Sequence, residues 1–118
     1  MDGLFKGLKV SDHAKTAQYE VVNHLMANGF RCLLEYVIGE YVVGKTGRID
    51  VIAINGDEKI AIEIDNVSPR KRSIIKLKMM GDYSRLILLR KGNYNCEIEG
   101  VKIISLGLKE VNHETTRV

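Results

Sequence analysis

Three acidic residues in the middle of the chain, Asp50, Glu63 and Asp65, have the types and the spacing to bind a metal ion. Their neighbours are strongly apolar, so carboxylates gathered there would repel one another without the full screening of water. Mg²⁺ or Mn²⁺ removes that repulsion, because it takes hard oxygen ligands and completes its shell with water and phosphate. Such an ion polarises a phosphoryl oxygen and lowers the pKa of a bound water, which phosphodiester hydrolysis requires. The alternative is an exposed sheet face on which the same acids are solvated.

The segments that carry these acids, 48–54 and 58–65, are predicted to form a β-hairpin. Asn-Gly at positions 55 and 56 separates the two apolar runs, and this dipeptide favours a type I′ turn. With Asn-Gly at the centre of the turn, Glu63 is the diagonal neighbour of Asp50 on one face of the hairpin. A four-residue loop would place Asp50 directly opposite Glu63, and a three-residue loop would send the two carboxylates to opposite faces.

A first helix is predicted from about Ser11, a good N-cap, to about Asn28-Gly29, a good stop. Apolar residues recur at helical spacing and form its buried stripe: Ala14, Ala17, Val21, Val22 and Leu25. Glu20 borders this stripe at the edge of the buried face. A carboxylate in that position can reach a site on the sheet.

The remaining segments predict an α/β fold with a mixed central sheet flanked by helices. Strands are expected at 31–38, 84–90 and 101–106, an irregular loop at 39–47 and a connection at 92–100. A second helix is expected to begin at Ser68-Pro69, with Ser as N-cap and Pro at the first helical position, and to end at Gly81. Strand, helix and buried strand form a parallel crossover. We expect one domain over residues 1–118, with a core of about 11–106 and a tail that frays from about 110.

Positive charge is concentrated in the second predicted helix, although the chain as a whole carries only +3. Five basic residues fall within nine positions: Arg70, Lys71, Arg72, Lys76 and Lys78. Clustered Lys and Arg are typical of a surface that binds nucleic-acid phosphates, and Lys45 and Arg48 in the predicted loop could also touch a phosphate. The alternative is a solvated helix face. The predicted partner is a nucleic acid, with DNA as the first expectation.

The order of these features resembles the PD-(D/E)xK nuclease superfamily and, within it, archaeal Holliday-junction resolvases and related viral nucleases. The resemblance covers about residues 11–90. It is carried by Glu20, by Gly47-Arg-Ile-Asp50 and by Ile62-Glu63-Ile-Asp65. It implies an αβββαβ core and a Mg²⁺- or Mn²⁺-dependent endonuclease that hydrolyses phosphodiester bonds of DNA, including branched or junction DNA.

The resemblance also implies a role for each matching residue. Asp50 and Glu63 would bind the metal, the backbone carbonyl of Ile64 would add a ligand, and Glu20 would assist. Resolvases of this kind act as homodimers that cut paired strands.

One position departs from the family pattern, because Asp65 stands where the family usually has Lys. That Lys orients the attacking water and offsets developing negative charge. Asp65 could instead be an additional metal ligand or base. A cation from the following helix could replace the Lys, with Lys76 as the first candidate and Lys78 or Arg72 as others. In the third interpretation catalysis is lost, and the chain is a nucleic-acid-binding module of the same fold.

The distribution of apolar residues and cysteines limits where the protein can be located and with what it can associate. No run of 18 apolar residues is present, which excludes a membrane-spanning helix, and the start of the chain lacks the apolar core of a signal peptide. Cys32 and Cys96 lack the spacing of metal ligands and suit reduced thiols, so an intracellular protein is expected. Ile75 and Met79 form an apolar patch outside the sheet-facing stripe of the second helix, which predicts a homodimer unless the chain itself covers the patch.

Overall fold

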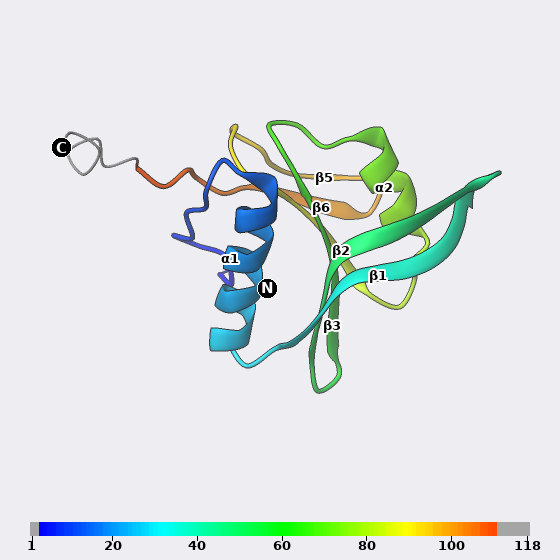
Figure 1. The fold of residues 1–118 in the computed structure, drawn as a ribbon, viewed down its shortest axis with the longest axis horizontal. Helices are drawn as coiled ribbons and strands as arrows, with labels where there is room; N and C mark the ends of the chain where they lie inside the picture. Colours follow the sequence, from blue (N-terminus) through cyan, green and yellow to red (C-terminus); the bar gives the residue numbers. More distant parts are fainter. Residues whose placement is uncertain (1–2, 111–118) are drawn as a thin grey trace.

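The computed structural model describes residues 3–110, which form an α/β fold around one six-stranded mixed sheet (Figure 1). In chain order the elements are α1 (Ala14–Ala27), β1 (Arg31–Val42), β2 (Lys45–Asn55), β3 (Glu58–Asp65), α2 (Lys71–Lys78), β4 (Ser84–Leu89), β5 (Asn95–Ile98) and β6 (Val101–Ser105). The strand order is β1-β2-β3-β4-β6-β5. β4 runs parallel to both of its neighbours, β3 and β6. The predicted fold class is confirmed. The tail that was predicted to fray lies, from residue 111 on, outside the described residues.

The two helices cover opposite faces of the sheet. The α1-side core contains Ala17, Val21 and Leu25 together with alternate residues of the central strands: Val51, Ile62, Leu86 and Leu88. The α2-side core contains Ile74, Leu77 and Met80 together with the intervening strand residues: Ile52, Ala61, Ile87 and Ile103. Because the central strands are buried on both faces, β4 has a continuous apolar sequence instead of an alternating one.

The hairpin between β2 and β3 is present, but its turn differs from the prediction. Val51 pairs with Ile62 and Asn55 pairs with Glu58, so Gly56 and Asp57 are the central turn residues. Among the described residues of this turn the positive φ is that of Gly56, at 61°. A positive φ at the first central position alone suits Gly in a type II′ turn, not the predicted type I′ turn of Asn-Gly. This register, continued by one residue, places Asp50 directly opposite Glu63.

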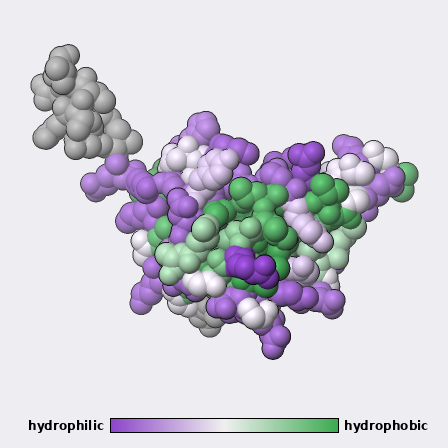
Figure 2. All heavy atoms as spheres, turned by 60° about the horizontal axis from the view of Figure 1, so that its bottom comes forward, coloured by the Kyte–Doolittle hydropathy of each residue, from purple (hydrophilic) through white to green (hydrophobic). Residues whose placement is uncertain are grey.

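The loop predicted at 39–47 is wrong, since β1 runs to Val42 and β2 begins at Lys45. Register shifts after Val37 and Glu40 let this glycine-containing stretch stay paired, and Gly44, with φ of 79°, closes the turn. The β1–β2 hairpin projects beyond the body of the molecule (Figure 1). Apolar side chains are exposed along it: Leu33, Leu34, Tyr36, Val37, Val42 and Val43. Figure 2 shows apolar surface both in the middle of one face and at the projecting end.

The starts of both helices differ from the sequence expectation. α1 has His13 as its N-cap in place of Ser11, and its ring accepts a hydrogen bond from the backbone of Thr16. α2 begins at Lys71 with Arg70 as N-cap in place of Ser68, and it ends before Met79. The reason at α2 is tertiary: the carboxylate of Asp65 accepts from the backbone N–H of Arg70 at 2.9 Å, so β3 supplies the cap.

The connection predicted at 92–100 contains a strand that sequence reasoning missed. β5 is a short, largely exposed edge strand that pairs antiparallel with β6, and it has no apolar alternation to reveal it. Within residues 3–110 no helix has the length and apolar character needed to cross a membrane.

Candidate active site

The alternation of side chains along β2 breaks at Asp50. Val51 packs in the α1-side core and Ile52 in the α2-side core, as a regular strand requires. Ile49, however, also packs in the α2-side core, although regular alternation would put it on the face of Val51. The irregularity therefore lies at the residue that carries the first candidate ligand.

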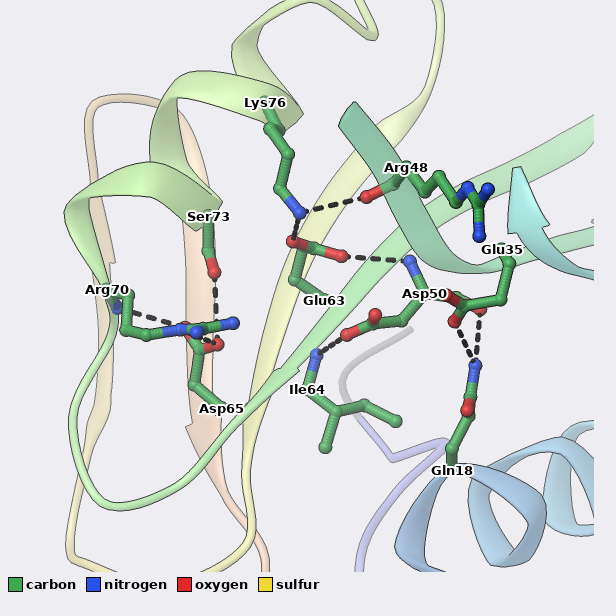
Figure 3. A network of polar contacts seen from close by, with 10 residues as sticks. All are labelled: Gln18, Glu35, Arg48, Asp50, Glu63, Ile64, Asp65, Arg70, Ser73 and Lys76. Carbon is green, nitrogen blue, oxygen red and sulfur yellow. Dashed lines mark hydrogen bonds and ion pairs between the residues drawn. The ribbon is translucent and has the colours of Figure 1, made fainter. Parts of the chain in front are cut away.

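Asp50 and Glu63 are held side by side by hydrogen bonds that replace the next rung of the β2–β3 ladder. The backbone N–H of Asp50 donates to Glu63 Oε2 at 2.8 Å, and the backbone N–H of Ile64 donates to Asp50 Oδ2 at 2.8 Å (Figure 3). Glu63 is completely buried, whereas Asp50 is partly exposed. The two strands thus present one carboxylate each at the same level of the sheet.

Lys76 of α2 reaches this pair of carboxylates. Its Nζ lies 2.5 Å from Glu63 Oε1 and donates to the backbone oxygen of Arg48 at 2.9 Å (Figure 3). The Lys76 side chain is only 11% exposed. Within the described residues Glu63 Oε1 accepts no hydrogen bond of regular geometry, so this close ion pair is the contact that the oxygen makes. The helix cation that was the first candidate to replace the missing Lys therefore lies at the carboxylate pair.

Burial sets the electrostatics of the pair. It raises the pKa of Glu63 to about 7, with a further contribution from the negative charge of Asp50, while Lys76 opposes the shift. Burial also raises the pKa of Asp50, the N–H of Ile64 and the charge of Lys76 oppose this rise, and the charge of Glu35 adds to it. One ammonium does not balance the carboxylates, so the site favours an additional proton or cation.

Two residues that sequence reasoning missed, Gln18 and Glu35, complete the surroundings of Asp50. Glu35 lies in β1 with φ of 52°, a strained conformation for a non-glycine residue in a strand. The β1–β2 ladder is regular on both sides of this level but omits the pair of Glu35 and Asp50. Gln18 Nε2 donates to Glu35 Oε2 at 2.8 Å and to the backbone oxygen of Asp50 at 2.9 Å (Figure 3). The sequence offered one signal for each residue. Glu35 is an acid within an otherwise apolar strand, and Gln18 is an amide on the buried side of α1.

Two adjoining pockets open onto Asp50 and share Glu35 and Arg70. The first has a volume of about 320 Å³ and its other lining residues are Ala14, Lys15, Gln18 and Ile64. The second has a volume of about 480 Å³ and its other lining residues are Tyr41, Thr46, Gly47, Arg48, Arg72 and Lys76. Each pocket is lined by acidic and basic residues together, which suits a phosphate ester with a bound cation.

Asp65 does not join Asp50 and Glu63. Its carboxylate accepts from the backbone N–H of Arg70 at 2.9 Å, from Arg70 Nε at 3.0 Å and from the hydroxyl of Ser73 at 3.0 Å. The expectation that Asp65 is a metal ligand or a base is not supported, because α2 occupies its oxygens.

Glu20 is also absent from the site. Its carboxylate accepts from the backbone N–H of Ser11 at 2.7 Å and forms an ion pair with Lys109. The expectation that Glu20 assists at Asp50 is therefore wrong, because Gln18 is the residue of α1 that lies beside Asp50. Gln18 lies on the helix face next to Ala17, which packs against the sheet.

The predicted phosphate contacts divide into two groups. Arg48, Arg70 and Arg72 line the pockets, whereas Lys45 and Lys71 are exposed outside them. Lys78 forms an exposed ion pair of 2.8 Å with Glu99. That pair removes Lys78 as a replacement for the family Lys.

The donor set of Asp50, Glu63 and the backbone carbonyl of Ile64 fits a hard divalent cation. Within residues 3–110 no group of three His, Cys, Asp or Glu side chains is placed to hold a metal ion. Mg²⁺ does not need such a group, since it binds through one or two carboxylates and takes water and substrate phosphate as its other ligands. Asp50 and Glu63, held side by side, supply these two carboxylates.

Comparison with known proteins places the fold and goes no further. No family model matches the chain. Seventy residues, 58% of the chain, are 36% identical to "Putative E3 ubiquitin-protein ligase RF4" of Arabidopsis thaliana, of which they span only 8%. The solved structure titled "Crystal Structure of Protein of Unknown Function AF1548" is similar with a TM-score of 0.54 and 16% identity, over 75% of this chain and 55% of that one. The likeness is one of fold.

Proposed function

We propose that this protein is a metal-dependent endonuclease that hydrolyses phosphodiester bonds of DNA, with branched or junction DNA as the preferred class. The observation that carries the proposal is the contact of Lys76 with Glu63 beside Asp50. Asp50 and Lys76 line one pocket together with three arginines, and the buried carboxylate of Glu63 contacts both of them. A purely structural ion pair would not need a second carboxylate, strained backbone and open space around it.

Each residue of the site has a chemical task in this proposal. Asp50, Glu63 and the Ile64 carbonyl would hold Mg²⁺ or Mn²⁺, which when bound polarises a phosphoryl oxygen and acidifies a water. Lys76 keeps a positive charge beside the reacting phosphate and can orient the attacking water through its ammonium protons. Gln18 holds the backbone of Asp50 and the carboxylate of Glu35, so that the acid-bearing strands keep their spacing.

Substrate binding is assigned to the basic groups around the carboxylates. Arg48, Arg70 and Arg72 line the pockets and would bind the phosphates nearest the scissile bond. Lys45 and Lys71, exposed outside the pockets, would bind phosphates further along the strand. The binding is accordingly expected to weaken as salt concentration rises.

A homodimer inside the cell belongs to the same proposal. Met79 is 44% exposed and Ile75 is partly buried, so the apolar patch of α2 remains available to a second copy. A two-fold contact there would present two sites to one branched substrate. The free thiols of Cys32 and Cys96 suit a reducing compartment.

The second candidate function is a nucleic-acid-binding module of the same fold without catalysis. It is favoured by the absence, within the described residues, of a group of three side chains placed to hold a metal. It predicts salt-sensitive binding without cleavage.

The deciding experiment compares linear, nicked, flapped and four-way DNA, and the corresponding RNA, with Mg²⁺, with Mn²⁺ and with chelator. Metal-dependent cleavage of a branched DNA supports the enzyme. Binding of these substrates without cleavage in either metal would overturn it in favour of the module.

A further inference from the structure

Gly47 of β2 lies where two side chains from other elements converge. A Cβ at this position would lie 2.8 Å from Cδ1 and 2.9 Å from Cε1 of the Tyr41 ring, and 2.9 Å from Cδ of Lys76. Carbon atoms do not approach so closely, so any side chain here would displace the ring or the lysine. The φ of Gly47 lies outside the left-handed region, so the backbone conformation does not itself require glycine. The space above Gly47 is what excludes other residues.

The stem of Lys76 uses that space. Lys76 approaches from α2, crosses β2 at Gly47 and ends with its ammonium on Glu63 Oε1 and on the backbone oxygen of Arg48. The aromatic ring of Tyr41, from β1, lies against the same point, and all three residues line the larger pocket. A lysine stem has several freely rotating bonds, so an ammonium at its end is well placed only where the stem is confined.

From these contacts we infer that Gly47 and Tyr41 are positioning residues for Lys76. The missing Cβ of Gly47 provides a channel for the methylene stem, and the Tyr41 ring borders the channel. The β1–β2 hairpin therefore contributes to the site through packing, in addition to carrying Glu35 and Asp50. The effect on catalysis rests on the proposed nuclease function, whereas the confinement of Lys76 is a property of the protein without substrate.

The first arm of the test measures the lysine directly. In ¹⁵N-labelled wild-type protein without substrate, the Lys76 ammonium should give a protected NMR signal, and its methylene protons should show cross-relaxation with the Tyr41 ring. Gly47→Ala should abolish or strongly weaken both signals, and Tyr41→Ala should weaken the ammonium signal. Gly81→Ala is the matched control, because a Cβ at Gly81 meets open space at an ordinary φ. Thermal unfolding of each variant checks that it is folded.

The second arm measures cleavage. Gly47→Ala should lower kcat by between about tenfold and a hundredfold while KM changes by less than about threefold, since a displaced ammonium acts on the reacting phosphate more than on binding. Tyr41→Ala should also lower kcat. Tyr41→Phe retains the ring and should restore kcat toward the wild-type value. In Gly47→Ala/Tyr41→Ala the added methyl no longer meets the ring but still lies 2.9 Å from Cδ of Lys76, so kcat should not exceed that of Gly47→Ala alone.

The outcomes separate this inference from the proposed function. If no variant or wild type cleaves DNA but Gly47→Ala still releases the Lys76 ammonium, the positioning stands and the nuclease proposal fails. If Gly47→Ala gives the same Lys76 signals as Gly81→Ala, the positioning is overturned whatever the activity. If Gly47→Ala does not fold, the Tyr41→Ala and Tyr41→Phe pair decides by the same NMR criterion.

Discussion

The carboxylate of Glu63 accepts a hydrogen bond from the backbone N–H of Asp50 at 2.8 Å, while the carboxylate of Asp50 accepts one from the backbone N–H of Ile64 at 2.8 Å. Each acid is thus anchored to the opposite strand by one oxygen. The anchoring donors are backbone groups, and the side chains of Gln18 and Lys76 add contacts to the backbone of Asp50 and to the carboxylate of Glu63. A pair of like charges is held together even though burial raises both pKa values.

Replacing Asp50 tests the catalytic role of this pair. Asp50→Asn should lower the cleavage rate on the order of 10⁴-fold. Asn keeps an oxygen that can accept from Ile64, and it removes the repulsion of Glu63, so the free energy of unfolding should stay equal or rise. Cleavage assays and urea unfolding measure the two effects, with Asp57→Asn in the exposed β2–β3 turn as control. Normal cleavage by Asp50→Asn would contradict the site.

Lys76→Met should separate turnover from binding. We expect kcat to fall about a hundredfold or more, with only a modest loss of DNA affinity, because Lys76 faces Glu63 while other basic residues line the pockets. Lys78→Met is the matched control, since its ammonium pairs with exposed Glu99. Steady-state kinetics and a filter-binding assay make the comparison. A loss of affinity alone would place Lys76 among ordinary phosphate contacts.

The raised pKa of Glu63 predicts how stability depends on pH in the absence of metal. The pKa of Glu63 rises from its ordinary value of 4.5 to about 7 on folding, so between these values the folded protein binds more protons than the unfolded chain. The contribution of Glu63 to stability is therefore complete below pH 4.5 and is lost as the pH rises through 7. Urea unfolding in chelator at pH 5 and pH 7.5 should show this decrease.

Mg²⁺ should reduce that pH dependence, because the cation stabilises the ionised carboxylates of the folded state. Glu63→Gln, which cannot ionise, should flatten the metal-free dependence and supplies the control. A Mg²⁺-independent stability profile at pH 7.5 would argue against a metal at Asp50 and Glu63.

Asp65→Asn should affect stability more than metal binding. Asp65 caps α2 through Arg70 and Ser73, so its replacement should reduce the free energy of unfolding by about 1–3 kcal/mol. Mn²⁺ affinity measured by calorimetry should change by less than about threefold if the only loss is in the α2 cap. Asp82→Asn, at an exposed position, is the control. A large loss of Mn²⁺ affinity would restore Asp65 as a ligand.

The proposed homodimer is tested by sedimentation. The wild-type protein should sediment at about twice the monomer mass, and Met79→Glu should shift it to monomer because a charge at a two-fold contact faces its own copy. Lys78→Glu, on the adjacent exposed position, controls for a general effect of charge. A wild-type monomer at high micromolar concentration would make cutting of paired strands by two adjacent sites implausible.

Local sequence patterns were sufficient to locate most elements and the two main acids. The stripe of Ala17, Val21 and Leu25 identified the core face of α1, and the continuous apolar run of β4 identified a strand buried on both sides. Asp50 and Glu63 stood out as charges within apolar strands. Such signals are readable because side-chain periodicity and burial are repeated along a single element.

Contacts between elements were decided only by the tertiary structure. Whether Asp65 or Lys76 lies at the Asp50–Glu63 pair depended on where α2 lies over β3. The hydrogen bond that occupies Asp65 also sets the start of α2, and Lys76 then reaches Glu63. Which residue of α1, Glu20 or Gln18, lies beside Asp50 depended on the rotation of the helix against β2. Each of these contacts joins residues that are far apart in the chain or on different elements, and no local periodicity records the distance between them.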